Sequence, residues 1–183
     1  MIRAFVAIAL PDAIVAQLQA VQQDLPVPRV LRPEALHLTL VFLGALREPV
    51  LEEAHLAFER IDAPGFALSL SSLGIFGGRK PRVVYAGLAE SAPLRRLQGK
   101  IERAARNVGL DLPHRRFVPH VTLARINTGR FDRDRLERFV AGHADLVSPV
   151  FPVTAFGLYA SHRGRQGAEY EELARYPLGP PQG

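Results

Sequence analysis

The sequence predicts a mixed α/β fold of the α+β kind, built as two lobes related by a pseudo-twofold axis. Three observations support this prediction. Segments typical of strands and helices alternate along the 183 residues, the order β–α–β occurs twice, and matched tetrapeptides stand at His37–Leu40 and His120–Leu123. A supersecondary unit repeated together with its motif indicates an internal duplication. We expect one bilobal domain over residues 1–183, since a single core usually serves ~100–200 residues.

The first half opens with a strand at Ile2–Leu10 and a helix whose first turn contains a proline, which that position favours. Apolar side chains recur along this helix at three- and four-residue spacing, at Ile14, Leu18, Val21 and Leu25. After a proline-rich turn, Leu36–Leu43 alternates as a strand does, with His37 and Thr39 on one face. Strict alternation also places Val41 on that face, and the other face then carries Leu36, Leu38, Leu40 and Phe42.

The rest of the first half is a helix at Val50–Ile61, an alternating strand at Phe66–Leu73 and a loop at Gly74–Pro81. The second half repeats this order. We expect a strand at Arg82–Leu88, a helix at about Ala92–Val108 closed by Gly109, a strand at His120–Ile126 and a helix at about Arg133–Ala141. Two strands, at about Val150–Ala160 and Ala168–Tyr176, surround a turn at Ser161–Gly167.

The composition excludes several kinds of protein. The chain has no cysteine, so it offers no disulfide, no thiolate nucleophile and no thiolate zinc site. Its 48% hydrophobic and 22% charged residues are typical of a globular protein, and its apolar runs are too short to span a membrane. Ile2–Leu10 is also too short, and too weakly charged at its start, for a signal peptide. We therefore expect a cytoplasmic protein with no membrane partner.

The net charge of +5 at pH 7 comes from 23 basic residues, all but two of them arginine, against 18 acidic residues. Guanidinium groups suit bidentate contacts with phosphate, so this balance favours an anionic partner. An arginine-rich and alanine-rich composition is equally expected from a GC-rich genome. Charge alone therefore does not decide the function.

Each tetrapeptide places an imidazole beside a hydroxyl, because residues i and i+2 of a strand share a face. If the lobes face each other, His37 and His120 converge on one cleft, with Thr39 and Thr122 beside them. Imidazole has an unperturbed pKa of ~6.5, so one ring can accept a proton from water while the other donates one to a leaving oxygen. The hydroxyls would stabilise the phosphoryl oxygens. This chemistry hydrolyses a phosphodiester without a metal, and we expect no metal and no cofactor.

These motifs resemble those of the two-histidine phosphoesterase superfamily, and specifically its RNA 2′,3′-cyclic phosphodiesterase branch, also called 2′-5′ RNA ligases. The similar stretches span nearly the whole chain and are Arg3–Ile8, Leu36–Gly44, Arg82–Gly87, Phe117–Arg125 and Leu158–Ser161. The resemblance implies two antiparallel sheets that flank a central cleft, with helices on the outside. It also implies an enzyme that hydrolyses terminal 2′,3′-cyclic phosphates of RNA to 2′-phosphates, and ATP-independent 2′-5′ joining of RNA ends by the same site.

The resemblance implies roles for individual residues as well. His37 would be the acid for the leaving O3′ and His120 the base for water, an order that pseudo-symmetry leaves open. Arg125 would contact phosphate, although simple alternation puts it on the face opposite His120, so that a bulge or a strand end is needed. Phe5 would pack on the nucleobase, and Tyr85 stands where members often carry tryptophan. Both aromatics are equally expected as core residues.

Alternative functions remain open at this point. A non-catalytic module of the same fold would bind nucleotides or RNA ends, and an enzyme with the same acid and base would act on another cyclic or 2′-5′-linked nucleotide. A zinc hydrolase would need a third ligand, which the cleft face of neither motif offers. The paired histidines and threonines favour the enzyme. We expect its partners to be RNA ends or nucleotide 2′,3′-cyclic phosphates, and the protein to be a monomer.

Overall fold

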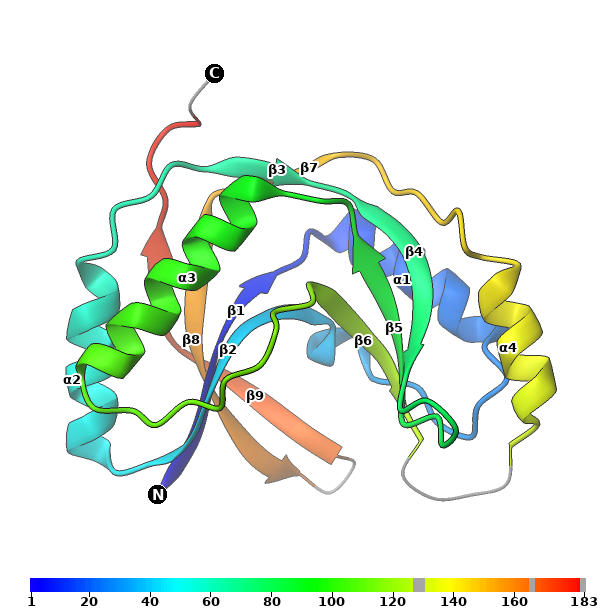
Figure 1. Cartoon of the computed structure of the whole chain (residues 1–183), viewed down its shortest axis with the longest axis horizontal. Coiled ribbons are helices and arrows are strands. Elements are labelled where there is room, and N and C mark those ends of the chain that lie inside the picture. Colours follow the sequence, from blue (N-terminus) through cyan, green and yellow to red (C-terminus); the bar gives the residue numbers. More distant parts are fainter. Residues whose placement is uncertain (127–130, 165–166, 182–183) are drawn as a thin grey trace.

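The computed structural model describes residues 1–126, 131–164 and 167–181, and most of its strands form one large antiparallel sheet (Figure 1). The strands of this sheet are β1 (Ile2–Ala9), β2 (His37–Leu46), β4 (Leu70–Phe76), β5 (Val83–Leu88), β6 (His120–Arg125), β8 (Ala155–Gly164) and β9 (Gly167–Pro177). Two short strands, β3 (Phe66–Leu68) and β7 (Phe151–Val153), pair with each other. The helices are α1 (Asp12–Asp24), α2 (Glu48–Glu59), α3 (Ala92–Asn107) and α4 (Arg133–Ala141).

The large sheet has two wings that meet at β2 and β6. Its strand order is β4-β5-β6-β2-β1-β8-β9, so β6-β5-β4 on one side of the centre corresponds to β2-β1-β8 on the other, with β9 added at one edge. Within the described residues, the registered pair that joins the wings is Leu38 with Val121. The two expected antiparallel sheets are therefore two wings of a continuous sheet, joined at the residues that follow the two histidines.

The two sequence repeats are intertwined. The first repeat gives β4 to the wing of β5, and the second repeat gives β8 to the wing of β1. The helices cross in the same way: α3 packs against β2, and Gln22 of α1 donates a hydrogen bond from Nε2 to the carbonyl of Leu123 in β6 at 2.9 Å. Figure 1 shows α2 and α3 beside β1, β2 and β8, and α1 and α4 beside β4, β5 and β6. Each wing thus needs both repeats for its packing.

Helix α3 shows how the sequence sets an element's bounds. Ser91 precedes the helix, and its hydroxyl oxygen accepts a hydrogen bond from the backbone N–H of Leu94 at 3.3 Å, which satisfies one of the free donors of the first turn. Gly109 follows the helix with a φ of +85°, a left-handed conformation that glycine adopts without strain. The face between these signals is buried through Leu94, Leu97, Ile101 and Ala105.

Two predicted strands are each divided in two. The segment predicted at Phe66–Leu73 forms β3 and β4, because the first part pairs with β7 while the second joins β5. The segment predicted at Val150–Ala160 divides in the same way into β7 and β8. The β8–β9 hairpin pairs as far as Gly164 with Gly167, so it runs through most of the predicted turn, of which residues 165 and 166 lie outside the described residues. Across the described chain, no helix has the length and apolarity needed to cross a membrane.

Candidate active site

A cavity of about 520 Å³ lies where the two wings of the sheet meet. Its wall contains most of the site residues that were predicted from the sequence, namely Phe5, His37, Thr39, His120, Thr122 and Arg125. Tyr85 does not line this cavity, and its ring lies beside His120 with the two ring centroids 5.6 Å apart. The fold therefore brings the two motifs to one cavity.

A bulge just after the threonine of each motif strand determines which side chains reach this cavity. The pairing of β1 with β2 skips Leu40, and the pairing of β5 with β6 skips Leu123. A bulged residue shifts the alternation that follows it by one position. As a result, Phe42 and Arg125 both line the cavity on the same side as the histidines. A bulge was one of the two ways in which Arg125 was expected to reach the cleft.

Because of the bulge in β2, the predicted alternation along Leu36–Leu43 is partly wrong. Strict alternation along Leu36–Leu43 placed Val41 with the histidine and Phe42 with the buried leucines. In the structure Val41 is buried, whereas Phe42 is 62% exposed and borders the cavity. The alternation is therefore wrong beyond Leu40, because the bulge at Leu40 turns two consecutive side chains, those of Leu40 and Val41, toward the core.

Both imidazole rings are anchored to the backbone two residues upstream. The Nδ1–H group of His120 donates a hydrogen bond to the carbonyl of Val118 at 2.8 Å, and His37 forms a hydrogen bond with the backbone of Ala35. Fixing one ring nitrogen in this way sets the tautomer and leaves the other nitrogen available for proton transfer. The duplicated motif thus repeats the anchor of each histidine as well as the histidine itself.

Aromatic rings hold His37 on two sides. Phe5 stacks on His37 with centroids 4.9 Å apart, and on Tyr159 at 5.5 Å. Tyr170 of β9 meets His37 edge-on at 5.0 Å. Phe5 is only 3% exposed, so its ring supports the imidazole and has little free surface for a nucleobase.

The ring of His120 has a smaller aromatic neighbourhood. Phe76 meets it edge-on at 5.0 Å, and Tyr85 lies at 5.6 Å. Phe76 and Tyr85 stack on each other with centroids 4.1 Å apart. Tyr85 therefore packs beside His120 and against Phe76, and its ring does not line the cavity.

Burial lowers the pKa of both histidines. The pKa of His37 falls from 6.5 to about 4, chiefly because burial disfavours the charged ring, with repulsion from Arg125 and His120 acting in the same direction against the hydrogen bond to Ala35. The pKa of His120 also falls below 6.5, through burial and then through Arg125, against the hydrogen bond to Val118. Burial therefore favours the neutral form of both rings.

Sequence reasoning missed several residues of the cavity wall, among them Arg3, Phe42, Ser161 and Tyr170. Phe42 was detectable, because it stands 83 positions before Arg125, the same offset that relates His37 to His120. Tyr170 had no such signal. It lies on β9, the strand that has no counterpart in the other repeat.

The polar groups on the wall suit an anion. They are imidazoles, hydroxyls and guanidiniums, and none of the described residues that line the cavity is acidic. The described part of the chain also contains no group of three or more histidine or acidic side chains placed to hold a metal ion. Hydrogen-bond donors and positive charge around one cavity are the groups that bind phosphate.

Two histidines, each followed after one residue by a threonine, lie on equivalent strands across one cavity and define the class of two-histidine phosphoesterases. A family model described as the 2′-5′ RNA ligase superfamily matches residues 10–165. The chain belongs to this family.

Curated relatives and solved structures are similar over most of the chain. A protein of Aeropyrum pernix named RNA 2′,3′-cyclic phosphodiesterase is 34% identical over 79% of this chain and 83% of its own length. A Geobacillus stearothermophilus protein of the same name is 35% identical over 87% of this chain, which spans only 51% of that relative. The crystal structure of Escherichia coli LigT complexed with 3′-AMP matches with a TM-score of 0.78 and 29% identity, and covers 97% of this chain and 98% of LigT.

Proposed function

We propose that this protein is an RNA 2′,3′-cyclic phosphodiesterase that opens terminal cyclic phosphates to 2′-phosphates by acid and base catalysis from two histidines, without a metal. The observation that carries the proposal is the placement of His37, Thr39, His120 and Thr122 around one cavity that also holds Arg125. The names of the relatives agree with this activity. The site offers both proton-transfer partners and the donors that a phosphoryl group requires.

The reaction uses one water molecule. A neutral imidazole takes a proton from the water as its oxygen forms a bond with phosphorus. The bond from phosphorus to O3′ breaks, and a protonated imidazole gives its proton to O3′. Thr39, Thr122 and Arg125 stabilise the charge on the non-bridging oxygens. The products are a 2′-phosphate and a 3′-hydroxyl, and the two histidines have exchanged their protonation states.

The electrostatics of the cavity favour His37 as the base and His120 as the acid. The ring of His37 is the more deeply buried and has a pKa lowered to about 4, so it is the harder ring to protonate. When one proton is shared between the two, His120 therefore holds it. This order is the reverse of the one that the family resemblance implies. It follows from the asymmetric burial of two otherwise equivalent residues.

The same site would also join RNA ends. An RNA 5′-hydroxyl that takes the place of water attacks the cyclic phosphate, O3′ leaves, and a 2′-5′ phosphodiester forms without ATP. We propose RNA ends and nucleotide 2′,3′-cyclic phosphates as the partners, a single bilobal domain as the unit that acts on them, and the cytoplasm as its location. We also propose that this unit is a monomer, because both motifs of the cavity come from one chain.

The proposed activity is tested with a nucleoside 2′,3′-cyclic phosphate, purified protein and an excess of chelator, followed by chromatographic identification of the product isomer. We expect the 2′-phosphate, at a rate that the chelator does not change. His114→Ala is the matched control, since His114 is exposed and lies outside the cavity, and its rate should equal that of the unmodified protein. Formation of the 3′-phosphate, or no turnover of any cyclic nucleotide, would contradict the proposal.

A further inference from the structure

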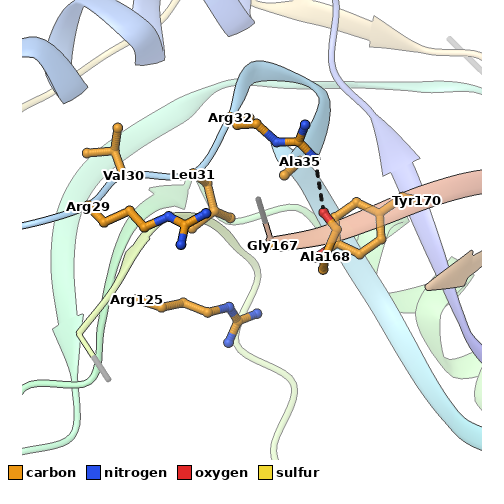
Figure 2. A pocket seen from close by; sticks show the side chains of 9 residues that line it. All are labelled: Arg29, Val30, Leu31, Arg32, Ala35, Arg125, Gly167, Ala168 and Tyr170. Atoms are coloured by element: carbon orange, nitrogen blue, oxygen red, sulfur yellow. Dashed lines mark hydrogen bonds between the residues drawn. The ribbon is translucent and has the colours of Figure 1, made fainter. Parts of the chain in front are cut away.

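A second, smaller pocket of about 210 Å³ adjoins the catalytic cavity. The two share part of their wall, through Leu31, Ala35, Arg125, Ala168 and Tyr170. The wall of the smaller pocket also carries Arg29 and Arg32, which do not line the catalytic cavity. Figure 2 shows the guanidinium groups of Arg29, Arg32 and Arg125 turned toward this common space.

The backbone that carries two of these arginines is fixed beside β6. Val30 forms an antiparallel bridge with Ala124, and the N–H of Leu31 donates to the carbonyl of Leu123 at 2.8 Å. Antiparallel register therefore places Arg29 opposite Arg125. Gln22 of α1 is buried, and its Nε2 donates both to Leu31 at 3.0 Å and to Leu123 at 2.9 Å.

Arg32 is also held from the other side of the pocket. Arg32 donates from Nη2 to the carbonyl of Ala168 in β9 at 3.4 Å (Figure 2), at the end of the hairpin that also carries Tyr170. The pocket is thus enclosed by three segments that are distant in sequence, and its position next to the cavity is built into the fold.

The charge of this pocket points to its ligand. Three guanidiniums share its wall, and none of the described residues that line it is acidic. Guanidinium groups crowded around one space repel one another, and an anion between them removes that repulsion. A phosphodiester group offers such a cluster two oxygens that share one negative charge, and planar guanidinium donors bind phosphate in a bidentate way.

We propose that the Arg29–Arg32 pocket is a subsite for the internucleotide phosphate next to the terminal cyclic phosphate of an RNA substrate. The inference rests on the proposed function, since it takes the catalytic cavity as the site of the cyclic phosphate. Arg125 lies on both walls and stands between the two phosphates. The subsite makes an RNA end a better substrate than a cyclic mononucleotide, because only the RNA end has a second phosphate to place there.

The test compares three substrates: a cyclic mononucleotide, a dinucleotide with a terminal 2′,3′-cyclic phosphate, and the same dinucleotide with an uncharged methylphosphonate linkage. The double substitution Arg29→Gln and Arg32→Gln should lower kcat/KM for the charged dinucleotide about tenfold, because it removes exposed charge-assisted contacts. The cyclic mononucleotide should change by less than about twofold, since neither arginine lines the catalytic cavity. Replacing the charged linkage by methylphosphonate should lower kcat/KM of the unmodified protein by a similar factor. The same replacement should not lower kcat/KM of the double variant any further.

Two controls separate charge from structure. Arg60→Gln with Arg103→Gln removes the same charge from two exposed positions outside both pockets, and should leave all three substrates unchanged. Arg29→Lys with Arg32→Lys should restore part of the dinucleotide preference. Raising the salt concentration should weaken use of the dinucleotide more than that of the mononucleotide, with a log–log slope steeper by ~0.7, as expected for one phosphate contact on a single strand.

Equal losses on the mononucleotide and the dinucleotide would overturn the inference and assign the arginines to holding the β8–β9 hairpin. No loss on either substrate would also overturn it. If none of the cyclic phosphates is hydrolysed, the proposed function fails, and the subsite is then decided by calorimetric binding of a dinucleotide 3′-phosphate. Binding about tenfold weaker in the glutamine double variant than in the Arg60 and Arg103 control supports the subsite, and equal binding in the two rejects it.

Discussion

The wing of β2 and the wing of β6 repeat the same geometry but surround it differently. Each has a His-x-Thr segment, a backbone anchor two residues upstream and a bulge one residue downstream of the threonine. Yet the position after the bulge is Phe42 in one wing and Arg125 in the other, and His37 is buried more deeply than His120. The shared features fix where the two imidazoles stand, whereas the deeper burial of His37 makes its ring the harder of the two to protonate.

Alanine at either histidine should have the largest effect. His37→Ala and His120→Ala should each lower kcat by ~10²–10⁴, because each removes one proton-transfer partner. Single-turnover rates on a cyclic nucleotide measure this loss, and circular dichroism checks that the fold is intact. Activity close to that of the unmodified protein in either variant would remove that histidine from the mechanism.

A substrate with a good leaving group distinguishes the roles of the two histidines. A phosphodiester that releases 4-nitrophenolate needs no acid, so the variant that lacks the acid should be much less impaired on it than on a cyclic phosphate. We expect this relief for His120→Ala and none for His37→Ala. Relief confined to His37→Ala would establish the opposite order of acid and base.

The positions after the bulges should differ in the kinetic constant that they affect. Arg125→Gln should lower kcat/KM ~100-fold through kcat, since a charged donor to the phosphoryl oxygens is lost. Phe42→Ala should raise KM about tenfold with kcat nearly unchanged, as expected for an aromatic surface that binds a base. Steady-state kinetics on a cyclic mononucleotide distinguish the two. Similar losses of kcat in both variants would mean that the wings are not specialised at this position.

The threonines should contribute less than the charged groups. Thr39→Val and Thr122→Val should each lower kcat about tenfold, the effect of removing one hydrogen bond from an uncharged hydroxyl to a charged oxygen. Thr154→Val serves as the control, because Thr154 is exposed and lies outside the cavity. Rates for Thr39→Val and Thr122→Val that match this control would return both threonines to a structural role in their strands.

The smallest expected effect concerns stability and again separates the two repeats. In the helices of the second repeat, the side chains of Ser91 and Asp132 accept hydrogen bonds from the backbone N–H groups of Leu94 and Arg135. Helices α1 and α2 have no side-chain cap. Ser91→Ala and Asp132→Ala should each lower the free energy of unfolding by ~1 kcal/mol and leave kcat unchanged. Urea titration measures the difference. Arg47→Ala, at the start of α2, is the control and should not change the free energy of unfolding.

Sequence periodicity located the elements and the two histidines because these depend on local patterns. A strand places residues i and i+2 on one face, so His37 with Thr39 and His120 with Thr122 could be paired without a structure. The helix at Arg133–Ala141 was also predicted with the bounds that it has. Features that depend only on residues near one another in the chain could therefore be predicted from the sequence.

Features that depend on pairing between distant segments could not be predicted from the sequence. A bulge at Leu40 is a property of the β1–β2 register, and one skipped residue moves Phe42 from the core to the cavity wall. The exchange of β4 and β8 between the wings is likewise set by tertiary packing. Tyr170 and the arginines of the second pocket reach the site through these same long-range arrangements.

The most direct test of the two-histidine account is the pH dependence of kcat/KM for a cyclic phosphate, measured with and without chelator. The base must be neutral and the acid protonated, so the acidic limb should lie near the His37 pKa of about 4 and the alkaline limb at that of His120, below 6.5. We expect a bell-shaped profile with its maximum between these limbs, unchanged by the chelator, whose apparent pKa values belong to the coupled pair of histidines. A rate that climbs to a plateau above neutral pH, is lost on chelation and returns with zinc would contradict it, because that behaviour indicates metal-bound hydroxide.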